Sequence, residues 1–91
     1  MTTNAVWLKI DGERVAPALQ EALAKLDNAG GEMVLDFCDV HRIDPGAIGE
    51  LEKLAGIADG KSVKIVLHGV SVDIYKVLKL AKLAPRFSFL N

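Results

Sequence analysis

The stretch VLDFCDVHRIDPGAIGELEKL, residues 34–54, runs from a strand-like segment into a helix-like segment through a corner that contains Asp-Pro-Gly. The apolar run before the corner is compact and holds one acid, Asp36, which is typical of a buried strand. Pro-Gly normally marks a turn, yet Asp44 can cap a helix whose first residue is Pro45, because a proline there has no N–H to lose. An apolar stripe at helical spacing follows the corner: Ile48, Leu51, Leu54, Ala55 and Ala58. We therefore predict a strand within residues 32–40 and a helix that begins at Pro45.

The segments on either side alternate between strand and helix patterns in the same way. Strand-like runs occupy residues 5–10, 62–70 and 86–90, and helix-like runs occupy residues 13–31, with a glycine stop, and 71–83. The order β-α-β-α-β-α-β predicts one α/β domain over residues 1–91, with a largely parallel or mixed four-stranded sheet flanked by helices. In such sheets the loops at the carboxyl ends of the strands carry the sites. The corner is one of those loops.

The composition narrows the function classes. Apolar residues make up 51% of the chain and charged residues 25%, with 11 basic against 12 acidic side chains. This balance argues against a nucleic-acid partner, which requires a basic stripe. No apolar run approaches ~18 residues, so we expect no direct membrane insertion. The first residues lack the pattern of a signal peptide and the chain has one cysteine, which together favour the cytoplasm.

The side chains with catalytic or ligand-binding potential are few and widely spaced. His41 and His68 are separated by a helix and a strand, without a convergent cysteine or carboxylate pattern, so we expect neither a metal site nor catalysis. Cys38 follows a strand and has no adjacent base, which indicates an inert thiol. Asp36 could be a general base, but a carboxylate that orders the loop by accepting backbone N–H bonds is favoured. No glycine-rich phosphate loop is present, so we predict a protein that is not an enzyme and that has no cofactor.

The corner itself has a distinctive surface. Gly46, Ala47 and Gly49 keep the first helical turn bare, so little side-chain bulk covers its N–H groups. Such positively polarised helix starts hold phosphates in some proteins. They also serve as flat platforms for a protein partner.

Residues 34–54 resemble the central motif of STAS domains, the anti-sigma-factor-antagonist fold, which reads as an apolar strand, Asp-Leu-Ser, a short loop and Ile-Asp-Ser-Ser-Gly-Leu-Gly before a helix. Asp36 matches the aspartate at the strand end, Ile43-Asp44 match Ile-Asp, and Ile48-Gly49 match Leu-Gly. The resemblance extends to LKIDGERVAPALQEAL, residues 8–23, and to VKIVLHGVSVDIYKVLKLAKL, residues 63–83. It therefore covers nearly the whole chain.

The departures from the family pattern bear on regulation. In regulated STAS domains the residue after the aspartate is a serine or threonine that a partner kinase phosphorylates, whereas this chain has Pro45 followed by Gly46. Neither can accept a phosphoryl group, so this switch is absent at the corner. Ser71 is a plausible helix cap and is also the candidate for a substitute phosphosite. Compared with many members, the chain looks trimmed, without an extra first strand and an extra last helix.

The resemblance implies a non-enzymatic interaction module in bacterial transcription regulation by partner switching. Its partner would be an anti-sigma factor or a related kinase-like ATPase. The contact residues would be those of the corner, Asp44, Pro45, Gly46, Ala47 and Gly49, with Asp36 and Asp39 supporting the loop before it.

Three other possibilities stay open. Residues 67–83 also resemble the small STAS subunit that supports the cytoplasmic ATPase of a phospholipid-transport ABC complex, although that subunit carries a hydroxyl at the corner. A stand-alone enzyme or ligand-binding protein is a further possibility, against which stands the lack of convergent catalytic groups. Finally, exposed strand edges beside Trp7, or beside Phe87 and Phe89, predict a homodimer.

Overall fold

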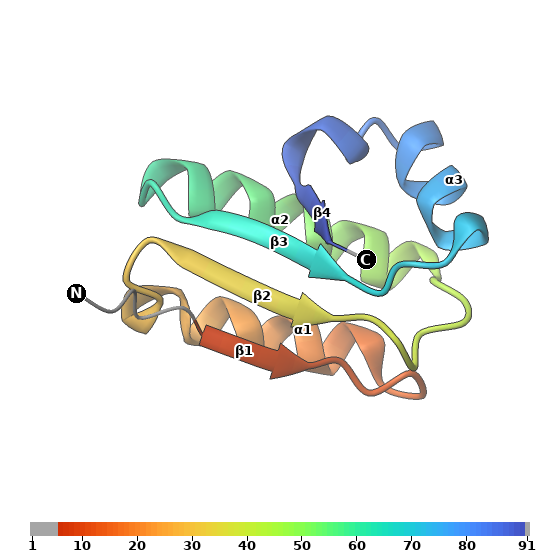
Figure 1. Ribbon diagram of the computed structural model, residues 1–91, viewed down its shortest axis with the longest axis horizontal. Helices are drawn as coiled ribbons and strands as arrows, with labels where there is room; N and C mark the ends of the chain where they lie inside the picture. The colour runs from red at the N-terminus through yellow and green to blue at the C-terminus, as the bar shows by residue number, and fades with distance from the viewer. Residues whose placement is uncertain (1–5, 91) are drawn as a thin grey trace.

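The computed structural model describes residues 6–90, which form one four-stranded sheet with strand order β1-β2-β3-β4. Every neighbouring pair of strands is parallel (Figure 1). The elements, in chain order, are β1 (Val6–Lys9), α1 (Val15–Ala24), the 3₁₀ turn η1 (Leu26–Asn28), β2 (Glu32–Asp36), α2 (Pro45–Gly60), β3 (Lys64–His68), α3 (Val72–Leu80), the 3₁₀ turn η2 (Ala84–Arg86) and β4 (Ser88–Leu90). The predicted α/β order is confirmed, and the sheet is parallel rather than mixed.

The parallel topology determines on which side of the sheet the helices lie. Each connects two adjacent parallel strands, and right-handed crossovers between consecutive strands place their helices on the same side of the sheet. Figure 1 shows α1 and α2 side by side behind β1, β2 and β3, with α3 beyond the carboxyl ends of the strands. All strands point the same way, so the loops that follow them gather at one end of the molecule.

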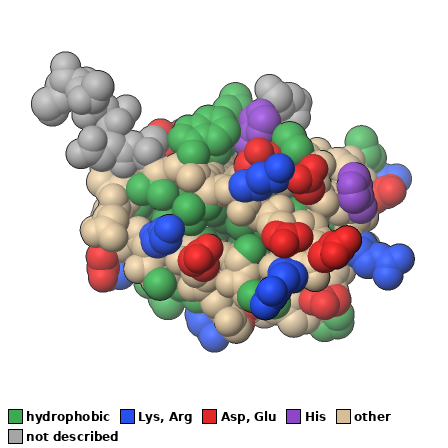
Figure 2. All heavy atoms as spheres, turned by 90° about the horizontal axis from the view of Figure 1, so that it is seen from below, with side chains coloured by type: hydrophobic (Ala, Val, Ile, Leu, Met, Phe, Trp, Pro, Cys, Tyr) green, Lys and Arg blue, Asp and Glu red, His purple; other side chains and the backbone are tan. Residues whose placement is uncertain are grey.

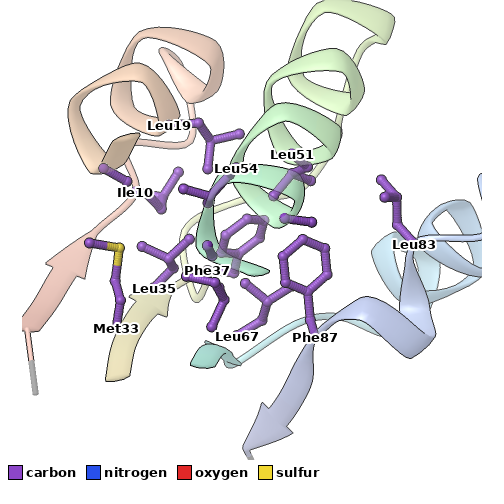
Figure 3. Packing of buried hydrophobic residues seen from close by; sticks show 14 of the residues in the cluster. Ile10, Leu19, Met33, Leu35, Phe37, Leu51, Leu54, Leu67, Leu83 and Phe87 are labelled. Carbon is purple, nitrogen blue, oxygen red and sulfur yellow. The ribbon is translucent and has the colours of Figure 1, made fainter. Parts of the chain in front are cut away.

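The core fills the space between the sheet and the helices (Figure 3). Its largest fully buried side chains include Ile10, Leu19, Leu35, Phe37, Leu51, Leu54 and Leu67. No polar or charged residue within residues 6–90 is buried. None of the helices in this range has the length and apolar character that a membrane crossing requires.

The face of the sheet opposite α1 and α2 is apolar at its centre, where Val34 and Val66 are buried with 5% and 7% exposure. Because side chains alternate across a strand, Val34 and Val66 point away from the core that Met33, Leu35 and Leu67 join. Trp7 pairs with Val34 in the register of β1 and β2, and 57% of its surface is exposed. Among residues 6–90, Trp7 is therefore the large apolar side chain of β1 that stays mostly exposed on this side of the sheet.

The helices α1 and α3 are shorter than the helix-like runs predicted at residues 13–31 and 71–83. The third helix ends at Leu80, because Lys82 adopts a positive φ of 61° and the N–H of Leu83 donates to the Leu78 carbonyl at 2.8 Å. This is a Schellman ending, which usually has glycine at the position of Lys82. The second helix ends in the same way, with Ser62 at φ 57°. Lys82 therefore lies in the turn after α3, although the predicted helical run of residues 71–83 includes it.

The last strand is shorter than residues 86–90, because η2 contains Pro85 and occupies Ala84–Arg86. Phe87 is only 8% exposed, so the expectation that it lies bare at a strand edge is wrong. In Figure 3 its ring points into the core between the sheet and α2. Phe89 is 37% exposed and meets the Tyr75 ring of α3 edge to face, with 5.1 Å between ring centroids.

Candidate functional site

The corner before α2 is built by its own short-range chemistry. Asp44 has extended backbone angles, and its Oδ1 accepts from the Ala47 N–H at 2.8 Å. Pro45 is the first helical residue, and the Ile48 N–H donates to the Asp44 carbonyl at 3.0 Å. The predicted capped helix start is confirmed, and its geometry is set before any partner arrives.

The structure sorts the corner residues into surface and core. Asp44, Pro45, Gly46 and Gly49 are exposed, and a Cβ added at Gly49 would meet no atom within 4 Å. Ala47 is fully buried, because it lies on the helix face that packs into the core. Its side chain is therefore out of reach of a partner in this conformation, and its part in the corner is the N–H that it donates to Asp44.

The loop between β1 and α1 lies directly against the loop that leads to the corner. A Cβ at Gly12 would stand only 1.9 Å from the carbonyl oxygen of Asp39, so glycine is required there for space. A hollow between the two loops is lined by Gly12, Glu13, Val15, Arg42 and Asp44. The surface of the corner thus continues into the β1–α1 loop. Glu13 and Arg42 line this surface, and neither is among the site residues predicted from the sequence. The one sequence feature that could have indicated them is Gly12 in the turn after β1.

Asp36 and Asp39, which are predicted from the sequence to support the loop, each contact a partner in or beside the loop that follows β2. The Cys38 N–H donates to Asp36 Oδ1 at 2.9 Å, which orders the start of the loop. That hydrogen bond holds the pKa of the Asp36 carboxyl below its usual value, and His68 acts in the same direction. Asp39 pairs with Lys9 of β1 at 2.9 Å and raises the pKa of that lysine. Both partners of this pair are largely exposed, so it adds little stability.

A second cluster lies on the same end of the sheet, where the sequence predicts no convergence of ligand-type side chains. Asp36 and His68 face each other in the register of β2 and β3, and Cys38 follows two residues after Asp36. His68 Nδ1 lies 3.7 Å from Cys38 Sγ and 3.6 Å from Asp36 Oδ1. The Trp7 ring is 5.6 Å from the His68 ring, measured between centroids. The expectation that His68 stands apart from any cysteine or carboxylate is therefore wrong, whereas His41 is exposed and outside the cluster.

Cys38 is not an activated nucleophile, even though the His68 imidazole lies beside its thiol. Hydrogen bonding to the Asp36 carboxylate raises the pKa of the Cys38 thiol, so the thiolate is disfavoured at neutral pH. Reactive cysteines have lowered pKa values instead.

Ser71 lies in the loop after β3, near the other two loops. Its hydroxyl accepts from the Ile74 N–H at 3.2 Å and caps α3, which confirms the predicted cap. The side chain is exposed. Ser71 also borders a hollow that Val70, Val72, Tyr75 and Phe89 line.

Charge does not distinguish a binding face on the side that carries β1 and α1. Figure 2 shows acidic and basic side chains intermixed there. On this face, therefore, charge does not mark a binding site for a partner of one sign.

Comparison with known proteins places the fold. No family model matches the chain, and no curated protein matches it. Among solved structures, a sulfate transporter family protein from Wolinella succinogenes has the same fold, with a TM-score of 0.78, 20% identity, and coverage of 98% of this chain and 79% of that one. The protein TM1081, solved by NMR, matches with a TM-score of 0.80 and 16% identity over 100% of this chain and 77% of its own. At these identities the likeness concerns the fold alone, which is the small α/β domain that the alternating strand and helix patterns predict.

Proposed function

We propose that this chain is a STAS-type protein-interaction module, whose docking surface is the corner at the start of α2 together with the adjoining β1–α1 loop. The observation that carries the proposal is the bare, pre-formed first turn. Pro45, Gly46 and Gly49 are exposed there, and open space surrounds Gly49. A backbone-rich surface of this kind lets a partner approach closely.

A protein partner suits this surface better than a phosphate. The Asp44 carboxylate already accepts the Ala47 N–H and lies 3.4 Å from the position of a Cβ on Gly46. A phosphate at the helix start would meet this negative charge at close range. The Asp44 carboxylate therefore already occupies the start of α2, and a protein partner could bind the exposed surface around it.

By its resemblance to STAS domains, the module would bind an anti-sigma factor or a related kinase-like ATPase. Pro45 and Gly46 carry no hydroxyl where the family's phosphoacceptor stands. Binding would then proceed without a phosphorylation switch at the corner. The ATPase of a phospholipid-transport complex is the alternative partner for the same surface.

Calorimetry with the kinase-like ATPase encoded nearest to this gene tests the proposal. We expect Gly49→Arg to weaken binding at least tenfold, because the long side chain covers the first turn. Gly56→Arg is the matched control, since Gly56 is also exposed on α2 with no atom within 4 Å of an added Cβ. It lies about 10 Å further along the helix and should leave the affinity within twofold.

The outcomes separate the partners from the surface. Equal loss in both variants, or no loss in either, would overturn the corner as the docking surface. If the kinase-like ATPase does not bind but the transporter ATPase does, with the same sensitivity at Gly49, the alternative partner is supported. Incubation with the kinase and ATP should leave the intact mass unchanged, and a phosphoryl adduct on Ser71 would move the switch to the β3–α3 loop.

A further inference from the structure

We propose that Asp36, Cys38 and His68 form a binding site for a divalent transition-metal ion of the zinc type, at the carboxyl ends of β2 and β3. Each residue offers one donor atom, and the three atoms lie within 4.8 Å of one another. This inference concerns a different surface from the corner and departs from the expectation of no metal site.

The spacing of the donors suits a tetrahedral ion. Bond lengths of about 2.3 Å to sulfur and about 2.0 Å to nitrogen or oxygen place tetrahedral ligands roughly 3.3–3.6 Å apart. The Cys38 Sγ to His68 Nδ1 distance is 3.7 Å, and the His68 Nδ1 to Asp36 Oδ1 distance is 3.6 Å. The donor atoms of Cys38 and Asp36 lie no more than 4.8 Å apart, so this pair would close by up to about 1.3 Å to seat an ion between the three side chains.

The backbone holds the donors in this arrangement. Asp36 and His68 are register partners at the ends of two hydrogen-bonded strands, and the Phe37 N–H donates to the His68 carbonyl at 2.7 Å. Gly69 leaves the space that Cys38 fills, since a Cβ there would stand 2.3 Å from the Cys38 sulfur. Gly69 also has a φ of 73°, which glycine adopts readily. The thiol is thus positioned by two strand ends and by a glycine of the next loop.

The donor set selects the class of ion. One sulfur, one imidazole nitrogen and one carboxylate oxygen suit zinc and its neighbours, whereas magnesium and calcium prefer oxygen ligands alone. The side chains of Asp36 and His68 are 27% and 29% exposed, so an ion can enter from solvent. Three protein ligands leave a fourth position for water. A bound ion would tie the loop after β2, which leads to the corner, to the end of β3.

Cobalt(II) provides a direct probe of the site, because a thiolate ligand produces a charge-transfer absorption with this ion. We expect the reduced protein to bind one equivalent of Co²⁺ with this absorption, and Zn²⁺ to displace it. Trp7, the single tryptophan, lies beside His68 and should lose fluorescence as Co²⁺ binds. Two independent signals then report on the same ion.

The variants separate this cluster from unspecific binding. Cys38→Ser should abolish the charge-transfer absorption, and His68→Gln should weaken Zn²⁺ binding at least tenfold while the circular dichroism spectrum is retained. His41→Gln is the matched control, since His41 is an exposed histidine outside the cluster, and it should bind as the parent does. If the parent shows no thiolate-to-cobalt absorption, or if His68→Gln and His41→Gln bind Zn²⁺ equally well, the proposal is overturned.

Discussion

Replacing Gly12 by alanine tests the contact that joins the two loops beside the corner. The added Cβ would lie 1.9 Å from the Asp39 carbonyl oxygen and 2.9 Å from the carbonyl carbon. Ordinary contacts lie at about 3.5 Å or longer, so one loop must move by roughly 1.5 Å. Gly12 is not among the residues with positive φ, and the loss of stability would therefore come from this contact rather than from backbone strain.

The expected cost is about 2–3 kcal/mol of the free energy of unfolding, the upper part of the range for steric overpacking, because only a backbone shift relieves this contact. For a domain of this size each kcal/mol lowers the melting temperature by about 4–8 °C, so we expect a decrease of roughly 10–20 °C. Urea unfolding followed by far-ultraviolet circular dichroism measures the free energy. The m-value should stay unchanged if the folded state is otherwise intact.

Gly49→Ala is the matched control for this measurement. Open space surrounds an added Cβ at Gly49, and alanine favours the helix over glycine, so the variant should gain about 0.5–1 kcal/mol. If Gly12→Ala instead unfolds within about 0.5 kcal/mol of the parent, the two loops do not touch as described, and the docking surface would shrink to the corner alone.

Three further substitutions test the local chemistry. Asp44→Ala should cost about 1 kcal/mol of stability in urea unfolding, because the Ala47 N–H loses its acceptor; an unchanged midpoint would contradict the cap. Lys82→Gly should gain about 0.5–1 kcal/mol, because Lys82 holds a φ of 61° that glycine adopts without a steric penalty; a loss would mean that the lysine side chain stabilises the turn. Asp36→Asn should make the thiol react faster with a disulfide reagent at neutral pH, because the carboxylate raises the Cys38 pKa; an unchanged rate would remove Asp36 as the cause.

Where a feature depends on neighbours in sequence, the sequence predicts it well. The cap at Asp44, the proline after it and the cap at Ser71 each involve residues within one helical turn, and all three lie as expected. The burial of Ala47 could also have been found, since Ala47 continues the spacing of Leu51 and Leu54 by one turn toward the helix start. Ala47 is predicted at the surface because its side chain is small, and that prediction does not take this helical spacing into account.

Features that depend on strand register or on unusual backbone angles are harder to predict. Asp36 and His68 are far apart in the chain, and they meet because two parallel strands align MVLD with IVLH. Ser62 and Lys82 adopt positive φ although neither is glycine, so the sequence does not indicate these two backbone conformations. In both cases tertiary packing decides between alternatives that local patterns leave equal.

The structure distinguishes between the two strand edges through which the predicted homodimer could form. β1 and β4 are the edge strands of the sheet that residues 6–90 form, but the two edges differ. At β4, Phe87 is buried and Phe89 already meets Tyr75. At β1, Trp7 remains 57% exposed, and Lys9 is the charged residue of this edge strand.

A homodimer is therefore expected to use β1 rather than β4. Light scattering at micromolar concentration should give about twice the chain mass of 9.8 kDa, and Trp7→Lys should return the mass to that of a single chain. The substitution replaces a side chain that is mostly in water, so circular dichroism should show the same fold. Phe89→Lys, at the other edge, should leave the dimer intact. A single species at the chain mass, or a dimer that only Phe89→Lys disrupts, would contradict the assignment to β1.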